Sequence, residues 1–496
     1  MNKTQLSIIV AICSCMILAH FYQLSTYLIN FPNWGDDFLF LAYFTDLPSL
    51  NFMEFGRRTT EFHSYIHRFP MARLITAIYS LFQSEFNFKT LTILANLSPI
   101  TIIYPLTKFV QRNQINPWHL VAMVGLLFAP NGNMDNFALI GVLQHTTSLV
   151  YLIWISYWIS DPKSRSWGIW FALLYPMFST EGLAFIPCIV LLLIYLRDSR
   201  VWIFSIAGLF VFYVYFLGYA SPATIPSSGS LVEKLLFTVK GTIVFIGGAV
   251  KKDLTISMII GTFFILNSLF ILWKYHQTKN GAFLFSGLIL LQLMAVGAMI
   301  TLGRGNAQAG DLGALFSERF SSYGLIFILI SYFAAIQPNL YTLKFSRNWL
   351  LIPALVWIGL STVLAKPKLE NLHTRLIADA SNAYYFNANT VYRFEEREIN
   401  LLKKSGNYTF PKEIVSPSSI RGKAQSMILT QLPEYEAGIS EYGIARDGIL
   451  LVEQANKPWL FLPINSLSHS IKIKKDIPFD QKMSRFMWIT TNKLAD

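Results

Sequence analysis

Two adjacent carboxylates, Asp36 and Asp37, follow directly after the first apolar stretch of this 496-residue chain. A carboxylate in such a place can act as a general base, hold a metal ion or pair with a cation, depending on its burial. The pair could hold a divalent cation such as Mg²⁺ or Mn²⁺ together with substrate oxygens, because such ions prefer oxygen ligands. The alternative is structural, since Asp is favoured at a helix N-terminus and a short amphipathic helix is expected over residues 38–44.

Four arginines are candidates for binding a phosphate group. Arg57 and Arg58 lie in the same segment as the acidic pair, residues 30–70, and Arg304 and Arg319 flank a later Gly-rich loop. The planar guanidinium group bonds phosphate through two parallel N–H groups. The alternatives are contacts with anionic lipid headgroups for the first pair and with acidic residues of the same loop for the second.

Glu181 lies between two short apolar segments and is the next candidate for the site. An acid at that depth is costly unless it is paired or in contact with water, so we interpret it as a second carboxylate of the site. His63 and His67 stand four residues apart and could share a helical face. Their surroundings lack the order of residues typical of zinc proteases, which favours surface histidines.

The composition predicts that membrane helices position these residues. Hydrophobic residues make up 53% of the chain and charged residues 14%, where a soluble globular protein has about 25% charged residues. Aromatic residues, at 15%, suit interfacial belts. A window of about 19 residues predicts about eleven spans: 6–27, 91–110, 118–129, 137–159, 167–178, 183–196, 202–219, 254–273, 282–302, 323–336 and 349–364.

The net charge of +12 would suggest nucleic acid as the partner of a soluble chain, but the placement of the charge excludes it here. The basic residues lie mostly in alternate short loops between apolar runs, as in membrane proteins whose positive loops face the cytoplasm. The N-terminus is therefore predicted to be cytoplasmic and the C-terminus outside. The loops are marked by Lys3, Arg112, Lys163, Arg165, Arg197, Arg200, Lys274, Lys279, Lys344 and Arg347.

Two further apolar stretches, 70–82 and 231–250, do not fit as crossings, and we interpret them as interfacial or re-entrant helices on the outer face. The spans form a module over residues 1–365. From residue 366 to 496 the sequence becomes mixed in charge and less apolar, which predicts a separate extracytoplasmic domain of mixed α/β type. The polar segments 30–70, 131–136, 179–182 and 303–323 then all face the same side of the membrane.

This plan resembles the GT-C superfamily of lipid-dependent glycosyltransferases. The resemblance rests on a first helix leading into a long loop that opens with Trp34-Gly35-Asp36-Asp37, on the interfacial helices, on many further spans and on a C-terminal outer domain. It is strongest to the bacterial and phage serotype-converting O-antigen glucosyltransferases. It implies that an acidic residue of the first outer loop is the catalytic base or an acceptor-binding group, and that the sugar donor is a polyprenyl phosphate.

The expected function is therefore an inverting hexosyltransferase of the bacterial inner membrane whose active site faces the periplasm. It would move a sugar, glucose by resemblance, to O-antigen, a lipid-linked repeat or another surface glycan. Asp36, or else Asp37, would take the proton of the acceptor hydroxyl, and the four arginines would neutralise the leaving phosphate. The alternatives are a polysaccharide flippase or transporter, and an O-antigen polymerase or ligase.

Overall fold

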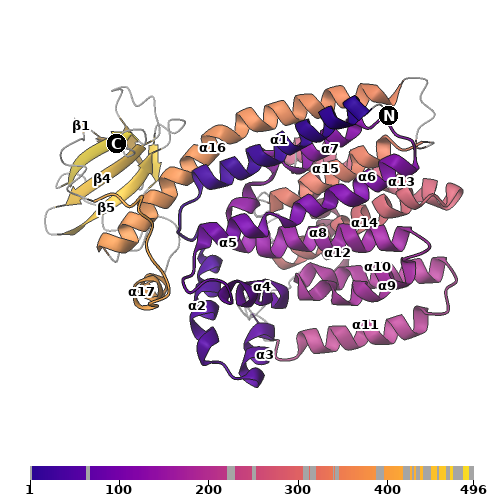
Figure 1. Cartoon of the computed structure of the whole chain (residues 1–496), viewed down its shortest axis with the longest axis horizontal. Coiled ribbons are helices and arrows are strands. Elements are labelled where there is room, and N and C mark those ends of the chain that lie inside the picture. Colours follow the sequence, from indigo (N-terminus) through magenta and orange to yellow (C-terminus); the bar gives the residue numbers. More distant parts are fainter. Residues whose placement is uncertain are drawn as a thin grey trace. The chain divides into compact units, whose positions relative to one another are not determined.

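The computed structural model shows an α-helical membrane protein, as the composition predicts (Figure 1). Five helical stretches are long and apolar enough to cross a bilayer: Lys3–Tyr27, Phe88–Arg112, Leu254–Thr278, Gly281–Leu302 and Arg347–Tyr385. Four shorter apolar stretches of 10–17 residues accompany them: Trp118–Leu127, Thr180–Tyr195, Val201–Phe216 and Ser321–Ala335. Short helices of this kind are tolerated at membrane depth where protein surrounds them.

The structure describes most of the chain up to residue 416 and, beyond it, the backbone of seven strands. The described residues are 3–62, 67–219, 230–248, 253–304, 312, 315, 320–338, 340, 346–386 and 396–416, together with the strands between 425 and 490. The chain divides into two compact units. Unit 1 comprises residues 1–21, 50–75 and 94–363, and unit 2 comprises residues 22–49, 76–93 and 364–496.

Unit 1 contains most of the helices. Their bounds are α1 Lys3–Tyr27, α3 Phe52–Thr60, α4 Pro70–Ser80, α5 Phe88–Ala95, η3 Ser98–Ile102, α6 Ile103–Arg112, α7 Trp118–Leu127, η4 Pro130–Gly132, η5 Met134–Phe137, η6 Gly141–Thr146, α8 Thr147–Ser160, α9 Arg165–Phe171, η7 Ala172–Met177, η8 Thr180–Ala184, α10 Phe185–Tyr195, α11 Val201–Phe216, α12 Leu231–Gly247, α13 Leu254–Thr278, α14 Gly281–Arg304, α15 Ser321–Ala335, η11 Arg347–Leu350 and α16 Leu351–Phe386. The helices α1, α4, α5 and α16 continue into unit 2. The predicted span 167–178 is a short α-helix followed by a 3₁₀ segment, because Pro176 interrupts it.

Helix α14 lies at the centre of unit 1 and packs against α8, α10, α12, α13 and α15. Aromatic side chains fill this core, with the rings of Phe109 and Phe285 4.9 Å apart and those of Phe285 and Phe333 5.4 Å apart. By contrast, α11 exposes Trp202 (76%) and Leu209 (70%), although its sequence is apolar throughout. An apolar face left exposed in this way is what a lipid-facing helix presents.

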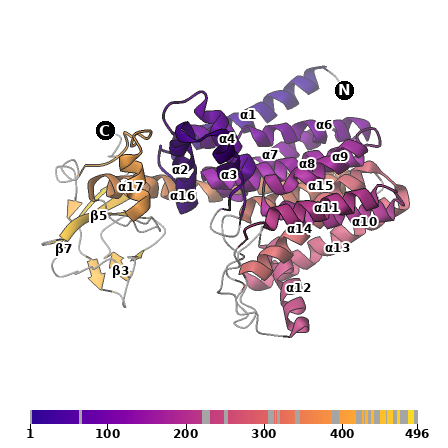
Figure 2. The same ribbon diagram turned by 90° about the horizontal axis from the view of Figure 1, so that it is seen from below.

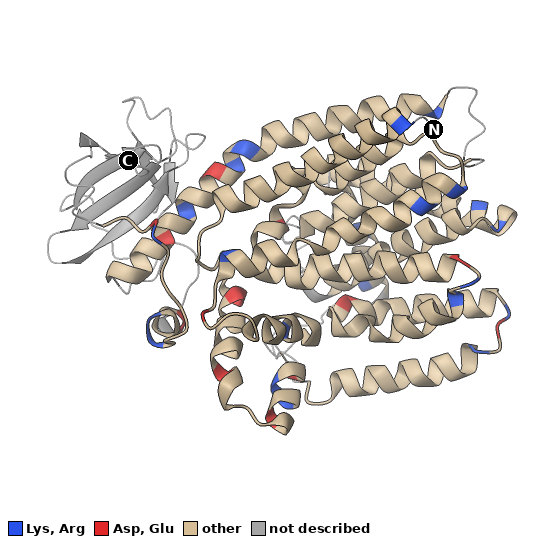
Figure 3. Cartoon of the chain, viewed as in Figure 1, with Lys and Arg blue, Asp and Glu red and all other residues tan. Residues whose placement is uncertain are grey.

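Most charged residues of unit 1 lie at helix ends and in the connections (Figure 3), and the exceptions include Arg73 in α4 and Lys240 in the middle of α12. Many of the lysines and arginines gather at the end of the helices where the N-terminus lies. The polar connections between α7 and α8 and between η7 and α10 meet each other and the first turn of α15, as described below. Figure 2 shows the same helices of unit 1 lying side by side from a second direction.

Unit 2 contains η1 Gly35–Asp37, α2 Phe38–Asp46, η2 Leu47–Ser49, the ends of the shared helices and α17 Glu396–Lys404. Its core includes Phe44, Phe86 and Phe88. The ring centroid of Phe86 lies 5.3 Å from that of Phe44 and 4.8 Å from that of Phe88. The segment after α17 is tied to the beginning of the unit, because Asn30 donates to the Thr409 carbonyl at 2.8 Å and the Phe86 amide donates to the Asn407 carbonyl at 2.7 Å.

The strands of unit 2 form two antiparallel sheets, in the orders β1-β7-β4-β5 and β2-β3-β6. In the first sheet Leu450 of β4 lies opposite Leu462 of β5 and Trp488 of β7. These strands are rich in branched and aromatic residues, which favour extended structure. The bounds are β1 Gln425–Ser426, β2 Leu429–Gln431, β3 Glu436–Ile439, β4 Gly448–Gln454, β5 Lys457–Ile464, β6 Ser470–Lys472 and β7 Ser484–Thr490.

Candidate functional site

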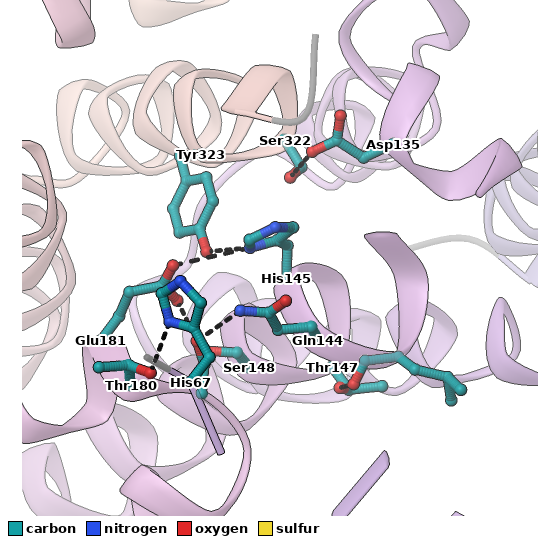
Figure 4. A network of polar contacts seen from close by, with 12 residues as sticks. His67, Asp135, Gln144, His145, Thr147, Ser148, Thr180, Glu181, Ser322 and Tyr323 are labelled. Carbon is teal, nitrogen blue, oxygen red and sulfur yellow. Dashed lines mark hydrogen bonds and ion pairs between the residues drawn. The ribbon is translucent and has the colours of Figure 1, made fainter. Parts of the chain in front are cut away.

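A buried polar cluster forms in unit 1 where the ends of several helices meet (Figure 4). It brings together Asp135 from the connection before α8, His145 from η6, Glu181 from η8, and Ser322 and Tyr323 from the first turn of α15. These five residues are each at most 7% exposed. We call them the polar cluster. Three of the four polar segments singled out in the sequence contribute to it.

His145 is aimed into the cluster by a turn of π-helix. The segment η6, Gly141–Thr146, is π-helical and continues into α8. Such a turn adds one residue to the helical repeat and redirects the side chains it carries, and it is frequent at functional sites. Gly141 makes the turn possible, because a Cβ there would lie 2.2 Å from the carbonyl oxygen of Asp135.

Polar side chains from three other segments hold the end of η6, where α8 begins. Thr146 donates a hydrogen bond to the side chain of Asn136, whose carbonyl accepts from the amide of Asn96 at 2.9 Å. Asn96 in turn contacts Nε2 of His20 in α1 at 3.2 Å. All four residues are buried. Hydrogen bonds are strong in the buried interior, so a network in which each member has a partner favours a single arrangement of its side chains. Here that network fixes the position at which α8 begins.

Glu181 is held in place from two sides. The Ser179 hydroxyl donates to Oε2 of Glu181 at 2.6 Å, and the amide of Gln292 in α14 donates to the Glu181 carbonyl at 2.7 Å. The other carboxylate oxygen, Oε1, lies 3.6 Å from Nδ1 of His145. That same nitrogen lies 2.6 Å from the hydroxyl of Tyr323. The cluster therefore contains a fixed carboxylate beside a fixed imidazole.

Asp135 lies on the other side of His145 (Figure 4). Its carboxylate accepts hydrogen bonds from Ser321 at 3.2 Å and from Ser322 at 2.9 Å. Burial raises the pKa of Asp135 from its ordinary value to about 7, although His145 and the two serines act in the opposite direction. The desolvation of the charged form outweighs these contacts because the side chain is fully buried.

We expect Asp135→Asn to raise the melting temperature of the detergent-solubilised chain at pH 8 and to leave it unchanged at low pH. Because the pKa is about 7 in the folded chain and near 3.8 in the unfolded chain, the folded chain holds the proton more tightly. The free energy of unfolding of the parent is therefore highest below about pH 4 and falls as the pH rises to about 7. Asparagine keeps the shape and does not ionise. Each kcal/mol in the free energy of unfolding shifts the melting temperature of a 150–250-residue domain by about 2–4 °C, and that of a longer chain by less.

Asp161→Asn is the matched control with the opposite sign. Burial of Asp161 acts to raise its pKa, but the Lys163 amide and the Arg112 guanidinium lower it overall, and Arg112 lies 2.9 Å from the carboxylate. This variant should lose stability at neutral pH and match the parent in acid. If the melting temperatures of the parent and Asp135→Asn change in parallel from pH 4 to pH 8, the raised pKa of Asp135 is contradicted.

The first polar segment of the sequence contacts η8, which carries Glu181, through His67, and contacts α11 through Arg68. Nδ1 of His67 lies 3.0 Å from the hydroxyl of Thr180, which lies 2.6 Å from the hydroxyl of Tyr215 in α11. Tyr215 also accepts a hydrogen bond from the Arg68 amide at 3.1 Å, and the guanidinium of Arg68 stacks 4.1 Å over the ring of Phe62. Residue 63 lies outside the described residues, so the expected pair of histidines is seen only in part.

Arg57 and Arg58 lie at the end of α3 and share one carboxylate with Arg73. Arg58 pairs with Glu61 at 2.7 Å, whereas the guanidinium groups of Arg57 and Arg73 are 3.8 Å and 3.9 Å from it. Arg73 is buried and donates to the carbonyls of Arg58 and Glu61 at 2.6 Å and 2.9 Å. Three arginines around one glutamate leave net positive charge. Arg57 is 70% exposed and can meet an anion.

Asp36 and Asp37 lie in unit 2, and their surroundings differ. Asp37 is 1% exposed, and its Oδ2 accepts hydrogen bonds from the amides of Asn33 and Trp34 at 2.9 Å and 3.0 Å. It reaches back to close the loop and does not cap α2 with its side chain. Asp36 is half-buried. The loop is further attached to α16, because Arg375 bonds the side chain of Asn33.

The predicted site residues thus fall into three groups. Glu181, Arg57 and Arg58 belong to unit 1, and Asp36 and Asp37 to unit 2. Arg304 ends α14 with its side chain outside the description, and Arg319 lies outside the described residues. The analysis of the sequence did not single out His145, although the position of this residue in the sequence is unusual. An ionisable side chain inside an apolar run such as 137–159 is costly to bury, so such a residue is a candidate for a functional role.

Across the described part of the chain, no group of three or more His, Cys, Asp or Glu side chains is arranged to hold a metal ion. Asp37 already uses one carboxylate oxygen to bind two backbone amides. A divalent cation beside Asp36 and Asp37, completed by substrate oxygens, stays a prediction. Comparison of the chain with protein-family models, with curated proteins and with solved structures gives no match.

Proposed function

We propose that the chain is an inverting glycosyltransferase of the bacterial inner membrane that uses a polyprenyl-phosphate sugar. The sugar, glucose in the first instance, passes to O-antigen, a lipid-linked repeat or another surface glycan on the periplasmic face. In this proposal the chain crosses the membrane about eleven times, with the N-terminus in the cytoplasm and the C-terminal domain outside. The basis in sequence is the resemblance to the GT-C superfamily described above.

One observation carries the proposal: the polar cluster is built from connections between the helices of unit 1 and from the first helical turns that follow such connections. Asp135, Glu181 and Ser322 all lie within a turn or two of a helix end. A polyprenyl-phosphate sugar has its reactive carbon at the membrane surface, and an enzyme that uses it needs its polar groups at that depth. A transporter is expected to bind its substrate near the middle of the membrane.

The chemistry requires one acceptor of a proton and one stabiliser of negative charge. The acceptor hydroxyl oxygen attacks the anomeric carbon, the bond from that carbon to the phosphate oxygen breaks, and its electron pair leaves with the phosphate. Asp36 contacts the acceptor hydroxyl, as the base or as the acceptor-binding group that the resemblance implies. Arg57 and Arg58, with Arg304 and Arg319, neutralise the polyprenyl phosphate that departs. A single displacement inverts the anomeric centre.

Buried ionisable groups are a specific reason to keep a polysaccharide flippase or transporter as the second candidate. Asp135, His145 and Glu181 are all buried in a helical bundle, as in proton-coupled transporters. An O-antigen polymerase or ligase is the third. Those families typically have a large outer loop late among the helices, whereas the acidic loop of this chain follows its first helix.

The test is sugar transfer by membranes that contain the chain, supplied with radiolabelled glucose on polyprenyl phosphate and with a glycan acceptor. The expected result is label in the acceptor, absent from membranes without the chain. Translocation of the labelled lipid across vesicles with no transfer would support the transporter. Transfer only of a preassembled lipid-linked oligosaccharide would support the polymerase or ligase. Absence of transfer from all hexoses tested on polyprenyl phosphate would overturn the proposal.

A further inference from the structure

His145 has the surroundings of a general base whose orientation is fixed by a carboxylate. Its Nδ1 faces two oxygens, the Tyr323 hydroxyl at 2.6 Å and Oε1 of Glu181 at 3.6 Å. The ring lies between this pair and Asp135 (Figure 4). Imidazole, carboxylate and hydroxyl therefore meet within one buried cluster.

The contacts at Nδ1 decide which ring nitrogen carries the hydrogen. Glu181 cannot turn away from the ring, because Ser179 holds its other oxygen at 2.6 Å and Gln292 holds its backbone. The Tyr323 hydroxyl is also within hydrogen-bonding reach of the Glu181 carboxylate. A hydroxyl that donates to the carboxylate accepts from Nδ1–H, so the hydrogen of a neutral imidazole lies on Nδ1.

The opposite nitrogen, Nε2, then carries the lone pair. Among the residues that the structure describes, none forms a hydrogen bond with Nε2 of His145. His145 also stands in a π-helical turn at the start of α8, next to the connection that holds Asp135. A neutral imidazole with one nitrogen fixed by a carboxylate and the other available is the arrangement by which histidine accepts protons from hydroxyl groups.

We propose that His145 is a catalytic residue that accepts the proton of the acceptor hydroxyl at Nε2. This inference rests on the proposed function and deepens it. As the acceptor oxygen bonds the anomeric carbon, its proton passes to Nε2, and the electron pair of the breaking bond leaves with the phosphate. The resulting imidazolium is stabilised by Glu181. Glu181 and Tyr323 are positioning residues.

His119 provides a matched control elsewhere in unit 1. It is also buried, at 1% exposure, and its Nδ1 lies 2.6 Å from the hydroxyl of Tyr332, the same contact that His145 makes with Tyr323. Within the described residues no carboxylate forms an ion pair with it. The two histidines therefore share burial and a tyrosine partner, and they differ in the carboxylate. Replacing each by asparagine keeps an N–H group near Nδ1 and removes Nε2.

The experiment compares the parent, His145→Asn and His119→Asn as purified full-length chains in detergent, with melting curves, kcat and KM for the donor. We expect His145→Asn to lose about 10²–10⁴-fold in kcat at unchanged KM, and His119→Asn to stay within a few-fold of the parent. Added imidazole should partly restore the rate of His145→Gly, which a purely structural role would not allow.

Two outcomes would overturn the inference. The first is a His145→Asn chain that keeps more than a tenth of the parental kcat. The second is a loss of activity that follows a lower melting temperature, with no recovery of His145→Gly by imidazole. If the parent itself transfers no sugar from polyprenyl phosphate, the proposed function fails. An active parent with an equally active His145 variant would instead refute only the role of His145.

Discussion

Replacing Asp36 by asparagine is expected to reduce sugar transfer by about 10²–10⁴-fold, the range for losing a proton-transfer or charged binding group at the reacting hydroxyl. Asp36 is half-buried, so the fold should tolerate a side chain of the same shape. The measurement is transfer of labelled sugar at matched expression, together with a melting curve in detergent. A loss confined to KM for the acceptor would assign Asp36 as a binding group, whereas a loss in kcat would assign it as the base.

Asp37 supplies the control for this prediction. Asp37→Asn keeps an oxygen that can accept from the Asn33 and Trp34 amides, so we expect activity near that of the parent. Asp37→Ala leaves both amides without their acceptor in a buried loop, at a cost of about 1–3 kcal/mol for each unsatisfied group. That variant should melt early. Loss of activity in Asp37→Asn with a normal melting curve, beside a fully active Asp36→Asn, would reverse the two roles.

Replacing Gly182 by alanine is expected to destabilise the chain by about 3 kcal/mol or more and to abolish activity. A Cβ at this position would lie 2.4 Å from the Tyr175 carbonyl carbon and 2.5 Å from the Pro176 nitrogen. Both are backbone atoms, so no rotamer change can relieve the overlap. The segment that carries Glu181 would have to move away from η7, and Glu181 would lose its place beside His145.

Gly56→Ala is the matched control for Gly182→Ala. Gly56 lies exposed in α3, and a Cβ there would have nothing within 4 Å. This substitution should leave activity unchanged and stabilise the chain by about 0.4–1 kcal/mol, because it restricts the unfolded chain. Melting curves of the three chains in one detergent provide the comparison. Equal melting temperatures for Gly182→Ala and the parent would contradict the tight approach of the two segments.

The amino-acid sequence determined the class of the protein and the positions of its apolar helices. Hydrophobic runs of membrane length are local properties of the chain, so they are visible without knowledge of the fold. The sequence also located the polar segments around Glu181 and Asp135. The helix that begins near residue 349 continues to Phe386, beyond the predicted end at 364, because helical structure can persist after the apolar composition ends.

Only the tertiary structure decided which of these residues meet. Glu181 and Tyr323 are 142 positions apart in the sequence, and the packing of α15 beside η6 brings both to His145. The two aspartates look alike in the sequence, yet backbone amides at residues 33 and 34 give Asp37 a structural role. Arg58 likewise proved to be paired with Glu61. Contacts of this kind depend on distances between segments, and neither composition nor periodicity contains them.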